Sequence, residues 1–180
     1  MKKTLLFLIA AIMTAACCQT NPNLDPAGDP VDYVTTIVGT QSVGMFSTGN
    51  TYPATAMPWG MNFWTAQTGN NENRWVYTYD APTIRGFRQI HQPSPWIGDY
   101  GMFSIMPVKN MAVVNEEARA SWFSHKNETT KPHYYQVYLA DHDVNVEITP
   151  TDRAAVMRFT FPESETSGIV VDAFQNGSYV

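Results

Sequence analysis

Apolar and polar residues alternate along the second half of the chain, which predicts β-strands with one buried face. Valine and isoleucine are separated by polar residues over 144–149. Residues 156–161 repeat this period of two and stop at Pro162. Successive side chains of a strand point to opposite faces, so both segments favour half-buried strands.

Further strands are predicted by three continuous apolar runs, over residues 102–108, 134–139 and 169–174. Residues 31–38 fit either a first strand or one helical turn. Residues 116–124 fit either a short helix or a strand that begins at Trp122. We expect no helix longer than two turns. Several short strands at close spacing favour an all-β fold, an antiparallel β-sandwich.

The N-terminus has the features of an export signal. Lys2 and Lys3 precede an apolar run over 4–16, which is too short to span a membrane comfortably. We expect residues 1–16 to be a signal peptide. Small residues before Cys17 resemble a bacterial lipobox, which predicts lipidation of Cys17 and a membrane anchor. Simple signal-peptidase cleavage is the alternative.

Residues 17–30 are polar and rich in proline, which predicts a flexible tether ahead of a domain over 31–180. The chain stops three residues after Asn176-Gly177, a dipeptide typical of hairpin turns. A returning strand should follow such a turn. We therefore expect a fragment whose β-sandwich is incomplete at its C-terminal end.

Composition narrows the classes of partner. Hydrophobic residues make up 44% of the 180 residues and aromatic residues 13%, which suits a packed β protein or a carbohydrate binder. The chain has 11 basic and 16 acidic residues, and loss of the signal peptide removes two of the basic ones. Nothing in this balance favours a nucleic-acid partner. The two cysteines are adjacent near the N-terminus, so the domain has neither a disulfide nor a thiolate metal site.

The richest segment for chemistry is residues 86–101, GFRQIHQPSPWIGDYG. Glycine and proline favour a bent, non-repetitive backbone, so we predict a rigid loop. Such a loop can present an aromatic face beside hydrogen-bonding groups, which is what a sugar-binding cleft needs.

Three sets of segments together resemble the N-terminal signature of glycoside hydrolase family 92. The first set is 37–40 (IVGT) with 49–61 (GNTYPATAMPWGM). The second is 86–91 (GFRQIH) with 98–101 (GDYG) and 105–107 (IMP). The third is 123–128 (FSHKNE), 132–135 (PHYY), 147–153 (EITPTDR) and 157–162 (MRFTFP). The likeness covers nearly all of 31–180. Departures are Ala54 in place of glycine, Met157 in place of histidine, and a different loop at 92–96, which bears on the substrate linkage.

Family 92 enzymes are calcium-dependent exo-acting α-mannosidases that invert the anomeric centre. The resemblance implies an N-terminal β-sandwich packed on a C-terminal (α/α)6 domain, with the active site between them. It also implies that the catalytic carboxylates and calcium ligands lie mainly in the C-terminal domain. We therefore expect no catalytic or metal-binding residue in this sequence, and an inactive chain that shapes a cleft for a mannose-containing glycan.

The candidate substrate-binding residues are Asn50, Trp75, Arg88, His91, Trp96 and Asp99. Trp75, which the resemblance places near the substrate, can stack on a hexose or can pack at the rim of the sandwich. Trp96 lies between prolines and a glycine and has the same two alternatives. Arg88 can bind a hydroxyl or pair with a carboxylate across the domain interface.

The remaining candidates have structural alternatives. His91 and Asp99 can bind sugar hydroxyls or brace the loop through backbone hydrogen bonds, and Asn50 can simply cap its turn. The competing function is a non-catalytic surface lipoprotein that binds glycans. For either function the expected location is the periplasm or outer membrane of a Gram-negative bacterium.

Overall fold

The computed structural model describes residues 28–41, 51–58, 60–72, 75–92 and 101–173. The chain divides into two units, Met1–Pro30 and Val31–Val180, and the fold below is that of the second. Its strands are β1 (Phe63–Gln67), β2 (Thr83–Ile84), β3 (Gly86–Ile90), β4 (Ser104–Val108), β5 (Ser121–Trp122), β6 (Glu128–Lys131), β7 (Tyr134–Leu139), β8 (Val144–Pro150), β9 (Ala155–Thr160) and β10 (Gly168–Asp172). Two 3-10 helices, η1 (Pro30–Tyr33) and η3 (His125–Asn127), are the named helices of the described residues.

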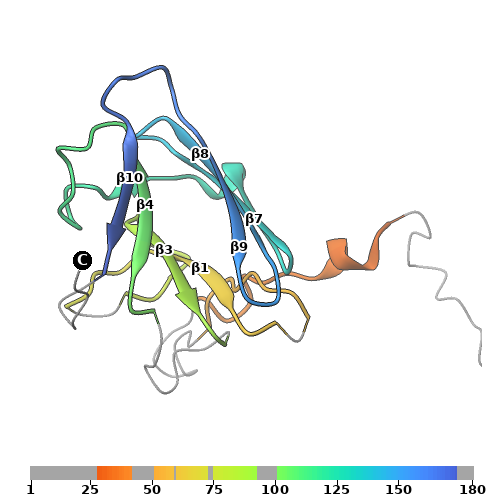
Figure 1. Ribbon diagram of the computed structural model, residues 1–180. Helices are drawn as coiled ribbons and strands as arrows, with labels where there is room; N and C mark the ends of the chain where they lie inside the picture. Colours follow the sequence, from red (N-terminus) through yellow and green to blue (C-terminus); the bar gives the residue numbers. More distant parts are fainter. Residues whose placement is uncertain (1–27, 42–50, 59, 73–74, 93–100, 174–180) are drawn as a thin grey trace, which may run out of the picture. The chain divides into compact units, whose positions relative to one another are not determined.

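The strands form an antiparallel β-sandwich (Figure 1). One four-stranded sheet has the order β1-β3-β4-β10, and the other has the order β6-β7-β8-β9. A two-stranded ladder joins β2 and β5. We name the four-stranded sheets by their first members, the β1 sheet and the β6 sheet.

Most strand predictions are confirmed. The segments over 134–139, 144–149 and 156–161 correspond to β7, β8 and β9 within a residue or two at each end. The run over 102–108 contains β4, and the run over 169–174 contains most of β10. Residues 31–38 begin with the helical turn η1, and in 116–124 a turn leads into β5 at Ser121.

The prediction of a bent loop was wrong for residues 86–90, which form β3 in the interior of the β1 sheet. Gly86 meets the requirement of close packing there. A Cβ at this position would lie 2.9 Å from the Cβ of Ser104 on neighbouring β4. The glycine therefore marks a close approach of two strands, and not a turn.

Register determines which side chains of the β1 sheet face the β6 sheet. Ala66 pairs with Phe87, Phe87 with Ile105, and Ile105 with Val171, so these four project to the same face. The Phe87 ring lies 6.0 Å from that of Tyr135 on β7, at 62°. The face is therefore the inner one, and its buried side chains join those of β7 and β8 in one hydrophobic core.

A buried carboxylate connects three parts of the sandwich. Glu128 begins β6, and its side chain is 2% exposed. Its Oε1 accepts from the Tyr135 hydroxyl at 2.7 Å, and its Oε2 accepts from the Tyr77 hydroxyl at 3.1 Å. His125 Nδ1 lies 2.6 Å from the same Oε2, and its ring stacks on Tyr79 at 3.9 Å. The pKa of Tyr77 is raised by burial first and by Glu128 second.

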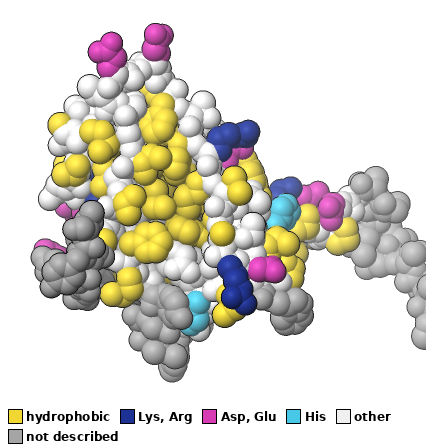
Figure 2. All heavy atoms as spheres, in the orientation of Figure 1, with side chains coloured by type: hydrophobic (Ala, Val, Ile, Leu, Met, Phe, Trp, Pro, Cys, Tyr) yellow, Lys and Arg dark blue, Asp and Glu magenta, His cyan; other side chains and the backbone are white. Residues whose placement is uncertain are grey.

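Apolar side chains remain visible between the two sheets at the β9 and β10 edges (Figure 2). Ile169 and Val171 of β10 belong to the inner face but are 43% and 64% exposed. Met157 and Phe159 of β9 and Phe161 are only half-buried against the core. We call these five residues the apolar band.

The outer face of the β1 sheet is also buried, and it mixes apolar side chains, such as Met106 and Val108, with polar ones. The polar ones include Thr65, Gln67, Arg88 and Ser104, each 2% exposed or less. Loops that follow β1 and β4 supply partners for these groups. Burial of polar groups without partners costs free energy, so this face requires a specific network of contacts.

Candidate functional site

Gln67 and Arg88 begin the network. They lie on neighbouring strands β1 and β3, on the outer face of the β1 sheet. Arg88 Nε donates to Gln67 Oε1 at 2.9 Å. Gln67 Nε2 donates in turn to Glu116 Oε1 and to the carbonyl of Gly69. Each amide atom of Gln67 is thereby used, which fixes the side chain on the sheet.

Arg88 uses its other two nitrogens to reach two loops. Nη1 donates to the Gly101 carbonyl at 2.6 Å, and Nη2 donates to Asn71 Oδ1. Gly101 follows β3 in the chain and Asn71 follows β1. A planar guanidinium offers several N–H donors in a fixed fork, so one side chain determines the spacing of both loops.

Trp75 lies against this guanidinium. The Arg88 Cζ is 4.6 Å from the centre of the indole, which is a cation–π contact. The Tyr52 ring packs on Trp75 at 5.5 Å and 31°. Trp75 is half-buried, so part of its surface is left for other contacts.

Gly101 also packs against Trp75. Its φ is +67°, in the left-handed region that favours glycine. A Cβ there would lie 3.2 Å from Cζ2 of the indole, which is closer than ordinary contact. Its amide donates to the Gln89 carbonyl at 3.0 Å. Both its conformation and its contacts therefore require glycine. We call Tyr52, Gln67, Asn71, Trp75, Arg88 and Gly101 the Trp75–Arg88 cluster.

The charge of Arg88 is compensated at a distance. Burial lowers its pKa to about 9, while Glu116 and Asp172 oppose this by favouring the charged form. Arg88 therefore remains a cation at neutral pH. Since its side chain is 2% exposed, its charge acts on the groups that enclose it.

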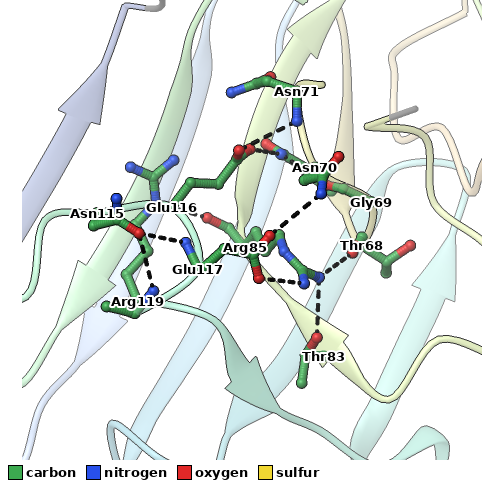
Figure 3. Close-up of polar contacts among 12 residues, drawn as sticks. Thr68, Gly69, Asn70, Asn71, Thr83, Arg85, Asn115, Glu116, Glu117 and Arg119 are labelled. Carbon is green, nitrogen blue, oxygen red and sulfur yellow. Dashed lines mark hydrogen bonds and ion pairs between the residues drawn. The ribbon is translucent and has the colours of Figure 1, made fainter. Parts of the chain in front are cut away.

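Figure 3 shows the flank of the cluster, where the loop after β4 crosses the chain around Arg85. Arg85 Nη2 pairs with Glu117 Oε2 at 2.9 Å, and Glu116 Oε2 accepts from the Asn71 amide at 3.2 Å. Arg119 is 1% exposed and pairs with Asp172 of β10 at 2.7 Å. These contacts hold the loop over 110–120 against the β1 sheet.

The structure brings together two of the six predicted site residues, Trp75 and Arg88. His91 is half-buried directly after β3. Asn50, Trp96 and Asp99 lie outside the described residues, as does Cys17. Sequence reasoning missed Gln67, Asn71 and Gly101 as partners of Arg88. The asparagine-rich stretch before Trp75, residues 70–73, is typical of a polar loop, but nothing in it indicates that Arg88 is its partner.

Within the described ranges, we find no group of three or more His, Cys, Asp or Glu side chains that could hold a metal ion. The donors of the Trp75–Arg88 cluster also do not fit calcium, since an arginine occupies its centre. No helix in the described ranges is long and apolar enough to cross a membrane.

The sequence profile of the glycosyl hydrolase family 92 N-terminal domain matches residues 33–179. The chain is also similar to a protein described as an uncharacterized secreted glycosidase of Arthroderma benhamiae. The two are 25% identical over 144 residues, which cover 76% of this chain and 18% of that protein.

Solved structures of the same family resemble this fold. A family GH92 inverting mannosidase from Bacteroides thetaiotaomicron has a TM-score of 0.71 and 47% identity, over 82% of this chain and 20% of that one. A family GH92 α-mannosidase from the same organism has a TM-score of 0.69 and 32% identity, over 79% and 20%. The chain thus spans about a fifth of the length of these relatives. On this profile match and the shared β-sandwich, the chain belongs to glycosyl hydrolase family 92, as its N-terminal domain.

Proposed function

We propose that this chain is the N-terminal part of an inverting, calcium-dependent α-mannosidase that removes terminal mannose from glycans. The observation that carries the proposal is the 47% identity to an inverting mannosidase over 82% of this chain. A binding protein without catalysis is not favoured, because the similar solved structures named above are both mannosidases.

The chain's own role in this proposal is to shape one wall of the substrate cleft. The half-buried indole of Trp75 offers an apolar surface beside polar groups, and aromatic rings stack on the apolar faces of sugars. Its Arg88 and Tyr52 contacts fix the ring before substrate arrives, which reduces the entropy lost on binding. We assign Asn50, His91, Trp96 and Asp99 to the same wall from the sequence resemblance.

Inversion requires one carboxylic acid to protonate the leaving oxygen and a second carboxylate to activate water, roughly 6.5–9.5 Å apart. We assign this pair to a C-terminal (α/α)6 domain of the same polypeptide. Because the family resemblance implies it, we assign the calcium ligands mainly to that domain as well. The chain alone is then inactive and depends on that domain as its partner.

We further propose that the protein is exported and anchored through a lipid on Cys17, at the periplasmic face or outer membrane of a Gram-negative cell. The likeness to a secreted glycosidase supports export in general. Metabolic labelling with a tagged fatty acid tests the anchor. Label that persists in Cys17→Ser would exclude lipidation at that residue.

The activity itself is tested by mannose release from defined α-linked mannobioses. We expect the full-length polypeptide to release mannose, a chelator to abolish the release, and calcium to restore it. The isolated 180-residue chain should release none. Release that continues in chelator would refute the calcium requirement, and glycan binding without any hydrolysis would favour the lipoprotein alternative.

A further inference from the structure

We propose that Arg88 is a positioning residue, which holds Trp75 and the Gly101 end of the neighbouring loop in the geometry that receives the sugar. The effect of this role on catalysis rests on the proposed function, whereas the contacts that Arg88 makes do not depend on it. It differs from the sequence expectation for Arg88, which was direct contact with a hydroxyl or an interdomain carboxylate.

Arg88 directs its donors to groups of the protein itself. Nε reaches Gln67, Nη1 reaches Gly101 and Nη2 reaches Asn71. The side chain is 2% exposed. A residue enclosed in this way acts on a ligand through the groups that it holds.

The three partners of Arg88 belong to separate segments. Gln67 is part of β1, whereas Asn71 and Gly101 lie in loops after β1 and before β4. Asn71 precedes Trp75 by four residues. The guanidinium therefore determines where the loop that carries Trp75 stands relative to the chain that re-enters the sheet at Gly101.

The guanidinium also contacts the indole directly. The Cζ–centroid distance is 4.6 Å, and Gly101 approaches the same ring so closely that a Cβ would crowd it. Movement of Arg88 would release Trp75 on this side and free the Gly101 carbonyl. Lysine cannot substitute, because a single ammonium has neither the planar face nor the fork that reaches three acceptors.

The experiment follows the Trp75 signal in the 180-residue chain labelled with 5-fluorotryptophan, with Trp75→Phe used to assign the resonance. We expect Arg88→Lys to shift or broaden the Trp75 resonance. The signal of Trp64, which is 7% exposed on the other face of the sheet, should stay unchanged and reports an intact fold. Arg85→Lys is the matched control, because it also removes a guanidinium but leaves the Arg88 contacts in place.

An unchanged Trp75 resonance in Arg88→Lys would overturn the proposal, as would an equal change in Arg85→Lys. If Arg88→Lys loses the Trp64 signal, Asn71→Ala supplies the test. Asn71 is exposed, and its removal cuts one bond to Arg88 without opening the core. It should move the Trp75 resonance, and no movement would refute the positioning role.

The consequence for function is measured in the full-length enzyme. We expect Arg88→Lys to raise KM for a mannoside about tenfold while kcat falls less, since the variant disturbs a binding surface and not the carboxylates proposed for bond cleavage. A fall in kcat alone would contradict this role. If the wild-type enzyme releases no mannose, the proposed function fails, whereas the resonance test still decides whether Arg88 positions Trp75.

Discussion

Replacing Glu128 with glutamine tests whether the buried carboxylate stabilises the sandwich. The substitution keeps the shape of the side chain but removes its charge. Three bonds reach this carboxylate, from Tyr77, Tyr135 and His125. Hydrogen bonds to charged groups contribute about 1.5–3 kcal/mol and neutral ones about 0.5–1.5 kcal/mol. A loss of about 1 kcal/mol for each bond predicts a free energy of unfolding lower by roughly 3 kcal/mol.

The assay is urea unfolding followed by tryptophan fluorescence. With a slope of about 2 kcal/mol per molar urea, the midpoint of Glu128→Gln should fall by roughly 1.5 M. Glu117→Gln is the matched control, because it also removes one carboxylate charge. Glu117 accepts a bond from Arg85, but its side chain is 60% exposed. Exposed pairs contribute little, so its midpoint should move by less than about a quarter as much.

A stabilising role for the buried carboxylate would be refuted if Glu128→Gln unfolded at the same urea concentration as Glu117→Gln. Equal midpoints would mean that the bonds to Glu128 contribute no more than solvent-exposed ones. A loss of stability in both variants would instead point to their shared loss of negative charge.

Three further predictions concern pH and the apolar band. The hydrogen bond from Arg158 lowers the pKa of Glu147 in the folded protein. The ionised Glu147 therefore contributes stability above the unfolded pKa, and this contribution is lost as pH falls. Glu147→Gln should flatten the fall of the urea midpoint between about pH 5 and pH 3. Burial raises the pKa of Tyr77 in the folded protein. The neutral Tyr77 therefore contributes stability below the unfolded pKa of about 10, and this contribution is lost as pH rises. Tyr77→Phe should weaken the alkaline loss of stability, measured by urea midpoints, while tyrosinate absorbance follows the ionisation of tyrosine. Val171→Asp should reduce binding of a hydrophobic dye without lowering the urea midpoint, because this side chain is 64% exposed, and undiminished dye fluorescence would show that the band is not the binding surface.

Alternation predicted the β6 sheet better than the β1 sheet, for a physical reason. Strands β8 and β9 turn every second side chain towards the core, and these side chains are apolar, so the period of two is visible. Strand β1 has four consecutive buried residues and β3 has buried residues on both faces, because loops cover the outer side. A strand buried on both faces loses the period of two, and polar residues such as Gln67 and Arg88 conceal it further.

The candidate site was predictable as residue types and not as contacts. Trp75 and Arg88 were both expected near the substrate, but their stacking depends on the register of β1 with β3 and on the course of two loops. Nothing local in the sequence relates Gln67 to Arg88, which are 21 residues apart. Gly101 was visible in the sequence as part of a glycine-containing motif, and its left-handed conformation explains why glycine is favoured at this position.

The outer face of the β1 sheet explains why the candidate site lies there. A purely structural cover would be apolar, since buried charges require desolvation that an apolar pair avoids. Here two arginines, Arg88 and Arg119, are 2% and 1% exposed on that side. Arg88 binds two loops through Gly101 and Asn71, and Arg119 ties its own loop to Asp172 of β10. Directional bonds fix loops in one arrangement, which nonspecific apolar contact does less well. Because loops on a rigid sheet commonly carry binding residues, we infer that the polar groups of this face serve to fix the loops around Trp75, at a cost in stability that apolar side chains would avoid.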